Sequence, residues 1–252
     1  MNITIGIVGC GFIGGALKRW LEEHNPEVGI RVSDPYKGMN DNFDDVDAVF
    51  ISIHVPTEAD GTQNLEPLEG IIRGLPDVPV FIRTTILPGT SAKLSASTGH
   101  KVNFMPEFLT QRTAYEDFCR QPMVFTAAPE LLAKIFKGKE YREMSSLEAE
   151  IAKYTHNVFG ALKVTYFNAI YDYCRKIGAD FSKVHEGVLL SGYINDTHTQ
   201  VPGPDGKFGY GGKCFPKDVN AFTEMTKGTP LGRLLAPLHE LNVGFRGVEE
   251  RI

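Results

Sequence analysis

Cys214 is the residue in this sequence best suited to act as a nucleophile. It lies in the stretch GYGGKCFPKDV, residues 209–219, between Lys213 and Lys217 and shortly before Asp218. Glycines let a backbone approach a ligand closely, and neighbouring lysines favour the thiolate form of a cysteine. A cysteine of an intracellular protein is also often a small, packed apolar residue. The stretch alone therefore leaves two interpretations, a packed residue in a tight turn or a nucleophile presented to a substrate.

Lys153 and Asn157 form a second candidate pair. They lie in SSLEAEIAKYTHNVFGALKVTYFNAIYDYCRKIGAD, which opens with a capping box from Ser145 to Glu148 and contains no proline before the stop signal at Gly178. This pattern predicts one long helix with both side chains on the same face. Because its apolar residues form more than one stripe, we expect burial on two sides, against its own domain and against a second subunit. On such a helix the pair is either solvated or needs partners, and a substrate is one candidate.

The amino-terminal segment ITIGIVGCGFIGGALKRWLEE has the pattern of a dinucleotide-binding unit. A short strand is followed by G-x-G-x-x-G at Gly9, Gly11 and Gly14 and then by an amphipathic helix. The next strand, GIRVSDP, ends in Asp34, where such units place the acid that binds the adenosine ribose. Asp34 should repel a 2′-phosphate, which favours NAD over NADP, although Lys37 lies close by in the sequence.

Strands and helices continue to alternate, which predicts a mostly parallel sheet of the α/β class. The predicted strands are DAVFISIHVPT, VPVFIRTTILPGT, KVNFMPEFL and PMVFTA, and EPLEGIIRGL and SAKLSAS are predicted helices. Ligands of such sheets bind beyond the carboxyl ends of the strands. Pro56, Thr57, Thr85 and Glu107 fall at those ends, either as ligand-binding residues or as polar residues that solvate turns.

Composition restricts the class of protein. A chain of 252 residues with 42% hydrophobic residues can bury a full core, and a net charge of −5 without a basic block argues against a nucleic-acid partner. The sequence has no apolar run long enough to span a bilayer and no basic stretch typical of a signal peptide. Its four cysteines are scattered, which favours neither a disulfide framework nor a metal site. We therefore expect a soluble protein of the reducing cytoplasm.

Taken together, the motifs make the chain resemble the UDP-glucose/GDP-mannose dehydrogenase family, NAD-dependent enzymes that oxidise the primary alcohol of a nucleotide sugar to a carboxylate. The resemblance covers nearly the whole length: the glycine pattern with Asp34, V-P-T at residues 55–57, R-T-T-I-L-P-G-T, M-P-E-F-L, E-x-x-K-x-x-x-N and G-Y-G-G-K-C-F-P-K-D. The last motif is highly specific and favours the functional interpretation of Cys214. The resemblance implies a Rossmann-type NAD-binding domain at residues 1–144, followed at 145–252 by a long dimerising helix and a short catalytic segment, as in 6-phosphogluconate dehydrogenase-like folds.

The resemblance also implies roles for individual residues, and it implies no metal. The catalytic set comprises the nucleophile Cys214, the oxygen-polarising pair Lys153 and Asn157, the assisting Asp218, the acid/base Glu107 near the hydrolytic water, and Thr85 beside cofactor and water. NAD is expected to contact Gly9, Gly11, Phe12, Ile13, Gly14, Asp34, Lys37, Val55, Pro56, Thr57, Thr85 and Gln111. The substrate is expected to contact Glu107, Phe108, Leu109, Lys153, Asn157, Phe208, Gly209, Tyr210, Gly211 and Gly212.

The family chemistry accounts for these residue types. A first hydride transfer to NAD yields an aldehyde, while the hydroxyl proton leaves through a water bound by Asp218 and Lys153. Cys214 attacks the aldehyde, a second hydride transfer turns the thiohemiacetal into a thioester, and water activated by Glu107 releases the acid. The thiol therefore allows a four-electron oxidation in one site.

Three departures from the family pattern affect the substrate assignment. The sequence stops at HELNVGFRGVEERI, where family members continue into a third, nucleotide-binding domain. SGYINDTHTQVPGPDGKFGYGG lacks the arginine expected before the glycine-rich loop, and Gln111 replaces an acidic residue that often follows P-E-F-L. The sugar is left open, and so are two alternatives: a two-electron β-hydroxyacid dehydrogenase, which has no need of Cys214, and an NAD-binding partner or regulatory protein without turnover.

Overall fold

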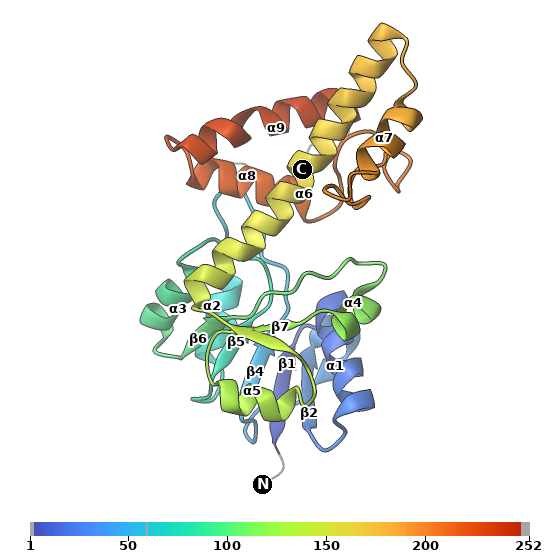
Figure 1. The fold of residues 1–252 in the computed structure, drawn as a ribbon. Coiled ribbons are helices and arrows are strands. Elements are labelled where there is room, and N and C mark those ends of the chain that lie inside the picture. Colours follow the sequence, from blue (N-terminus) through green and yellow to red (C-terminus); the bar gives the residue numbers. More distant parts are fainter. Residues whose placement is uncertain (1–2, 59, 248–252) are drawn as a thin grey trace. The chain divides into compact units, whose positions relative to one another are not determined.

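The computed structural model describes residues 3–58 and 60–247, in which the chain divides into two compact units. The first unit contains the chain up to Pro56 together with Gln63–Lys153, and the second contains Thr57–Thr62 and the chain from Tyr154 onward. The division falls inside α6 (Ser146–Ile177), the long helix that the sequence predicts (Figure 1). About two turns of α6 thus belong to the first unit and the remainder to the second.

The first unit is built on a six-stranded sheet, and the predicted Rossmann-type α/β class is confirmed. In spatial order its strands are β3 (Met39–Asn40), β2 (Gly29–Asp34), β1 (Thr4–Val8), β4 (Ala48–Ile51), β5 (Val80–Ile82) and β6 (Val102–Phe104). Neighbouring strands are parallel except β2 and β3. Val8 is in register with Ser33 of β2 and Ile51 of β4, so the carboxyl ends of three strands meet where the strand order reverses. In sheets of this topology, that switch point is where ligands bind.

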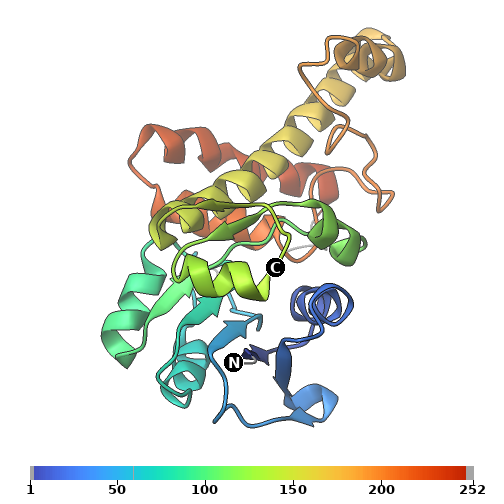
Figure 2. The same ribbon diagram turned by 60° about the horizontal axis from the view of Figure 1, so that its bottom comes forward.

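Helices cover both faces of this sheet. They are α1 (Phe12–His24), α2 (Glu66–Arg73), α3 (Thr90–Thr98), α4 (Ala114–Arg120) and α5 (Pro129–Ile135), with a 3-10 turn η1 (Pro35–Lys37) after β2. Ile7 and Phe50 pack in the core under α1, α4 and α5, whereas Val49 and Ile51 pack in the core under α2 and α3. Figures 1 and 2 show α1 (blue) on the opposite side of the sheet from α2 and α3. Strands buried on both faces explain the continuous apolar runs in the sequence.

The strand β7 (Met123–Phe125) corrects the expectation that PMVFTA extends the main sheet. It pairs instead with β8 (Tyr141–Glu143) in a separate two-stranded parallel sheet. The start of α6 closes the outer edge of β6, because the Phe104 N–H donates to Ser146 Oγ at 3.1 Å. A further strand at this edge would need the Phe104 N–H, which already donates to Ser146.

The capping box at the start of α6 is confirmed. The Glu148 carboxylate accepts hydrogen bonds from the Ser145 N–H and hydroxyl, both at 2.7 Å, and the Glu148 N–H donates to Ser145 Oγ at 3.2 Å. At the other end Gly178, with φ +76°, follows the last residue of the helix. These local signals fix both ends of the element that carries Lys153 and Asn157.

The second unit is helical. It combines the longer part of α6 with α7 (Phe181–Leu189), α8 (Phe215–Met225) and α9 (Pro230–Arg246). Gly160 lets α6 approach α8, since a Cβ there would lie 2.7 Å from the Phe215 ring. Tyr154 of α6 stacks on Phe222 of α8 with 5.0 Å between ring centroids. Of the helices in the described residues, none has the length and apolar character needed to cross a membrane.

Candidate functional site

The glycine pattern forms a tight turn between β1 and α1 in which each glycine has a different role. Gly9 has φ +81°, and a Cβ there would lie 2.9 Å from the Ser52 carbonyl oxygen. A Cβ on Gly14 would lie 2.0 Å from the Gly9 carbonyl oxygen, so the first turn of α1 packs directly on the loop. Gly11 has no atom within 4 Å of an added Cβ, which leaves open space at the N-terminal end of the helix. This is a backbone cradle suited to a phosphate group.

Asp34 and Lys37 both bind the loop that follows β1. Asp34 is 9% exposed, and its Oδ2 accepts the Cys10 N–H at 2.8 Å. Lys37 Nζ donates to the Cys10 carbonyl oxygen at 2.5 Å. The carboxylate predicted to bind a ribose therefore lies beside the glycine turn, and the ammonium of Lys37 is engaged by the loop backbone.

The other residues predicted to bind the cofactor lie on several segments. Phe12 and Ile13 begin α1, and Phe12 is 36% exposed. Val55 and Thr85 are buried beyond β4 and β5, Pro56 is half-buried, and Gln111 is exposed. Thr57 belongs to the second unit. The structure therefore brings together the glycines, Asp34 and Lys37, while contact of the remaining residues with a cofactor stays a prediction.

Glu107 and Lys153 form a buried ion pair in the first unit. Glu107 is 7% exposed and Lys153 is 4% exposed. Lys153 Nζ donates to Glu107 Oε1 at 3.0 Å and to the Glu107 carbonyl oxygen at 2.5 Å. The other carboxylate oxygen accepts the Leu109 N–H at 2.7 Å, and Lys153 Nζ lies 5.5 Å from the Phe108 ring centroid. A buried pair of this kind holds a carboxylate and an ammonium in fixed positions.

Glu150 holds the start of α6 against α3, a role that no local sequence pattern predicts. It is 1% exposed, and its carboxylate accepts the Gly89 N–H at 2.6 Å, the Ser91 N–H at 2.9 Å and the Ser91 hydroxyl at 2.6 Å. Helix α3 has no side-chain cap of its own, so Glu150 supplies the missing acceptor from another element. The contact positions Lys153, which follows one turn later on α6.

Asn157 and Asp218 form the corresponding polar cluster of the second unit. Asp218 is fully buried, and its Oδ2 accepts from Asn157 Nδ2 at 2.6 Å. Lys217 Nζ lies 2.5 Å from Asp218 Oδ1, and His156 Nδ1 lies 2.9 Å from Asn157 Oδ1. Lys153 and Asn157, predicted to act as a pair, are thus each held by a different carboxylate.

Cys214 is exposed at the start of α8. It occupies the N-cap position, and its carbonyl oxygen accepts the first bond of the helix from the Asp218 N–H at 3.0 Å. Backbone N–H groups at a helix N-terminus favour negative charge, and the neighbouring Lys213 adds positive charge, whereas the charge of Lys217 is offset by its ion pair with Asp218. The packed interpretation of Cys214 is therefore wrong for this structure, because a packed residue would be buried.

Polar side chains from α6 and α9 hold the glycine-rich loop before Cys214. Asn242 accepts the Tyr210 N–H at 2.7 Å and donates to the Tyr210 carbonyl oxygen at 2.9 Å. Asn168 Oδ1 accepts the Gly209 N–H at 2.9 Å, and Arg246 Nη2 donates to the Gly209 carbonyl oxygen at 3.2 Å. Burial raises the pKa of Tyr210. Sequence patterns did not single out these anchors, because they lie far from the loop in the sequence.

Close packing explains why two of the positions predicted to contact substrate are occupied by glycine. A Cβ on Gly209 would lie 2.4 Å from Asn242 Oδ1, and a Cβ on Gly211 would lie 2.5 Å from the Arg246 guanidinium carbon. Gly212 has φ +77° and open space around it, and Phe208 is half-buried with its ring centroid 5.3 Å from that of Tyr171. Substrate contact by Phe208, Gly209, Tyr210, Gly211 and Gly212 stays a prediction.

Comparison with known proteins confirms the family resemblance. Residues 147–242 match the central domain of the UDP-glucose/GDP-mannose dehydrogenase family. The UDP-glucose 6-dehydrogenase of Rickettsia conorii is 28% identical over 206 residues, which cover 75% of this chain and 46% of that protein. The GDP-mannose 6-dehydrogenase of Pseudomonas putida is 30% identical over 206 residues, which cover 70% of this chain and 46% of that protein. The chain therefore spans about half the length of the curated relatives it matches.

Solved structures share the fold. A UDP-glucose dehydrogenase from Pyrobaculum islandicum superposes with a TM-score of 0.76 at 24% identity, covering 95% of this chain and 68% of that one. A GDP-mannose dehydrogenase from Pseudomonas aeruginosa superposes with a TM-score of 0.65, also at 24% identity, covering 97% of this chain and 69% of that one.

Proposed function

We propose that this chain, which resembles the UDP-glucose/GDP-mannose dehydrogenases, oxidises the primary alcohol of a nucleotide sugar to a carboxylate. The observation that carries the proposal is the exposed Cys214 at the N-cap of α8, with Lys213 and Lys217 beside it. Relatives named UDP-glucose and GDP-mannose 6-dehydrogenases support the substrate class. An exposed thiol in this position has little value for packing and considerable value as a nucleophile.

NAD is the proposed cofactor, and the first unit offers a site whose residues fit it. The open space at Gly11 suits a pyrophosphate at the N-terminus of α1, and Asp34 beside the turn suits a ribose diol. The same carboxylate disfavours the 2′-phosphate of NADP. When bound, NAD would supply the acceptor for the hydrides that leave the substrate carbon.

Cys214 would make the second oxidation possible. Its thiolate adds to the carbon of the aldehyde, and the carbonyl electron pair moves to oxygen, which gives a thiohemiacetal. Loss of a hydride from that carbon leaves a thioester, and water then displaces the thiolate to give the acid. The positive end of α8 and the neighbouring Lys213 favour the thiolate as attacking and as leaving group.

The remaining polar residues would manage protons and the developing oxyanion. Lys153 and Asn157 would donate hydrogen bonds to the reacting oxygen, as oxyanion stabilisers do. Glu107, held by Lys153 and the Leu109 N–H, would accept a proton from the water that attacks the thioester. Asp218, held by Lys217 and Asn157, would orient the water that removes the alcohol proton. Thr85 would border the cofactor and water.

A homodimer built on α6 and a cytoplasmic location belong to the same proposal. Phe159, Tyr166, Tyr173 and Ile177 of α6 are each at least 58% exposed. Apolar side chains in such number on one helix suit an interface with a second subunit. Phe167 of the same helix is 4% exposed and packs against His185 of its own chain, so it lies outside this exposed set.

A panel of nucleotide sugars and β-hydroxyacids, each incubated with NAD, tests the proposal through NADH absorbance and the mass of the product. Two NADH per molecule of acid from a nucleotide sugar is the expected result. One NADH per β-hydroxyacid would establish the two-electron dehydrogenase instead. NAD binding without turnover of any member of the panel would identify an NAD-binding partner protein.

A further inference from the structure

Tyr36 is an exposed aromatic residue next to the carboxylate proposed to bind a ribose. It is 103% exposed, so its ring is open to solvent. It lies in η1, two positions after Asp34, and two residues span at most about 7 Å of backbone. Single exposed aromatic residues are common on protein surfaces, so exposure alone assigns no role to Tyr36. The contacts of its neighbours in the chain point to one.

The turn that carries Tyr36 is bound to the glycine loop on both sides of this residue. Before it, Asp34 Oδ2 accepts the Cys10 N–H at 2.8 Å. After it, Lys37 Nζ donates to the Cys10 carbonyl oxygen at 2.5 Å. Cys10 belongs to the G-x-G-x-x-G pattern. Tyr36 is therefore held beside the loop proposed to bind the pyrophosphate of the cofactor.

The backbone around Tyr36 is restrained as well. Pro35 has a φ fixed by its ring, and Gly38, with φ +70°, ends the turn by donating its N–H to the Pro35 carbonyl oxygen at 3.1 Å. Met39 then pairs with Asp34 in the antiparallel contact between β2 and β3. Tyr36 is thus presented by a short hairpin that the chain's own contacts hold, and a preorganised contact costs less entropy on binding.

The Asp34 carboxylate keeps one oxygen for a ligand. Its Oδ2 binds the Cys10 N–H, whereas Oδ1 has no hydrogen-bond partner among residues 3–58 and 60–247. Oδ1 is not one of the unpartnered side-chain atoms that the fold covers completely, so it keeps surface that a ligand can contact. A ribose bound there through its hydroxyls carries adenine on the adjoining C1′ carbon. The base of such a ligand lies close to the turn that carries Tyr36.

We propose that Tyr36 binds NAD by stacking its ring on the adenine base. The inference rests on the proposed NAD-binding function and adds a contact to the base, since the glycine loop suits the pyrophosphate and Asp34 suits the ribose. Adenine presents a flat π face, so stacking on tyrosine adds affinity without hydrogen bonds to the edges of the base. The contact depends on the adenine half of the cofactor and is independent of the nicotinamide half.

Isothermal titration with ADP-ribose tests this contact, because this probe has the adenine, both riboses and the pyrophosphate but lacks nicotinamide. Tyr36→Ala should raise the Kd about 5- to 30-fold, whereas Tyr36→Phe, which keeps the ring, should stay within about twofold of the wild type. Tyr193→Ala is the matched control, since Tyr193 is 91% exposed and lies in the second unit, and it should leave the Kd unchanged. Equal Kd values for the wild type and Tyr36→Ala would overturn the stacking contact and leave NAD binding intact. A wild type that binds neither ADP-ribose nor NAD would refute the proposed cofactor and this contact with it.

Proton NMR of ADP-ribose supplies a readout that a structural role of Tyr36 would not change. Because Tyr36 is exposed, its variants should have the urea midpoint of the wild type, which shows that they are folded. An aromatic ring stacked on adenine moves the H2 and H8 resonances of the base upfield. At saturation these resonances should move further upfield on the wild type than on Tyr36→Leu. Equal shifts on the two proteins would contradict the stacking contact.

Discussion

Breaking the ion pair between Glu107 and Lys153 should destabilise the first unit strongly. Lys153→Met removes the ammonium that pairs with Glu107, a residue that is 7% exposed. Of the hydrogen bonds described above for this carboxylate, the one from the Leu109 N–H then remains. Removal of one partner of a buried pair costs about 3–5 kcal/mol in the free energy of unfolding. Replacing both partners by uncharged residues of similar size removes the unpaired charge. Glu107→Gln/Lys153→Met should therefore cost only about 1–2 kcal/mol, mainly for the lost bond to the Glu107 carbonyl oxygen.

Urea unfolding followed by Trp20 fluorescence is a suitable assay, because Trp20 is 4% exposed in the core of the first unit. With an m-value of about 2 kcal/mol per molar, Lys153→Met should lower the urea midpoint by about 1.5–2.5 M and the double variant by about 0.5–1 M. The double-mutant cycle then gives a coupling free energy of about 2 kcal/mol or more between the two side chains. A double variant as unstable as the sum of the two single variants would refute the reasoning, because it would show that the two charges do not depend on each other.

Three further predictions concern the cofactor, the scaffold and assembly. Asp34→Ala should weaken NAD binding and reduce its preference over NADP, and isothermal titration that shows tighter NADP binding to the wild type would contradict the assignment. Glu150→Ala should lower the stability of the first unit by about 2–4 kcal/mol in the same urea assay, because three donors, two of them in buried hydrogen bonds, lose their acceptor, and a loss below about 1 kcal/mol would disprove that role. Tyr166→Asp, on the exposed side of α6, should turn a dimer into monomers in light scattering, whereas Glu58→Lys should not; a wild type that is monomeric at low micromolar concentration would rule out the interface.

The sequence predicted those features whose residues lie within a few positions of one another. The glycine turn after β1, Asp34 at the end of β2 and the capping box of α6 each require particular residues within a few positions, so the sequence carries them directly. The start of α8 directly after Cys214 agrees with Pro216 in the first turn of that helix, because proline is favoured near helix starts.

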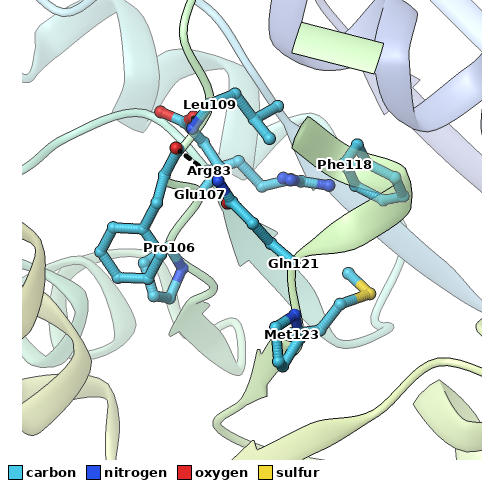
Figure 3. Close-up of a pocket in the computed structure, with 9 residues that line it drawn as sticks. Arg83, Pro106, Glu107, Leu109, Phe118, Gln121 and Met123 are labelled. Atoms are coloured by element: carbon cyan, nitrogen blue, oxygen red, sulfur yellow. Dashed lines mark hydrogen bonds between the residues drawn. The ribbon is translucent and has the colours of Figure 1, made fainter. Parts of the chain in front are cut away.

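Features that depend on distant segments could not be predicted in this way. Glu150 binds α3 across 59 positions, and Asn242 binds Tyr210 across 32, so neither contact has a local pattern. Arg83 directly follows an apolar strand and is 1% exposed, with its guanidinium beside the Phe118 ring (Figure 3), and no pattern in the neighbouring sequence predicts this burial of a charged residue. The strand β7 satisfies the local rules for the main sheet, but the start of α6 already occupies the edge where it would pair.

The most direct test of the proposed chemistry is the ratio of NADH formed to nucleotide sugar consumed, measured for the wild type and for Cys214→Ser. A serine hydroxyl is a far weaker nucleophile than a thiolate at neutral pH, and the exchange changes one atom of an exposed side chain. The wild type should form two NADH for each molecule of acid. Cys214→Ser should still bind NAD and should form no acid, and mass spectrometry of the acid-quenched wild type should detect a substrate adduct on Cys214. Acid production by Cys214→Ser at the wild-type rate would contradict a covalent role for this cysteine.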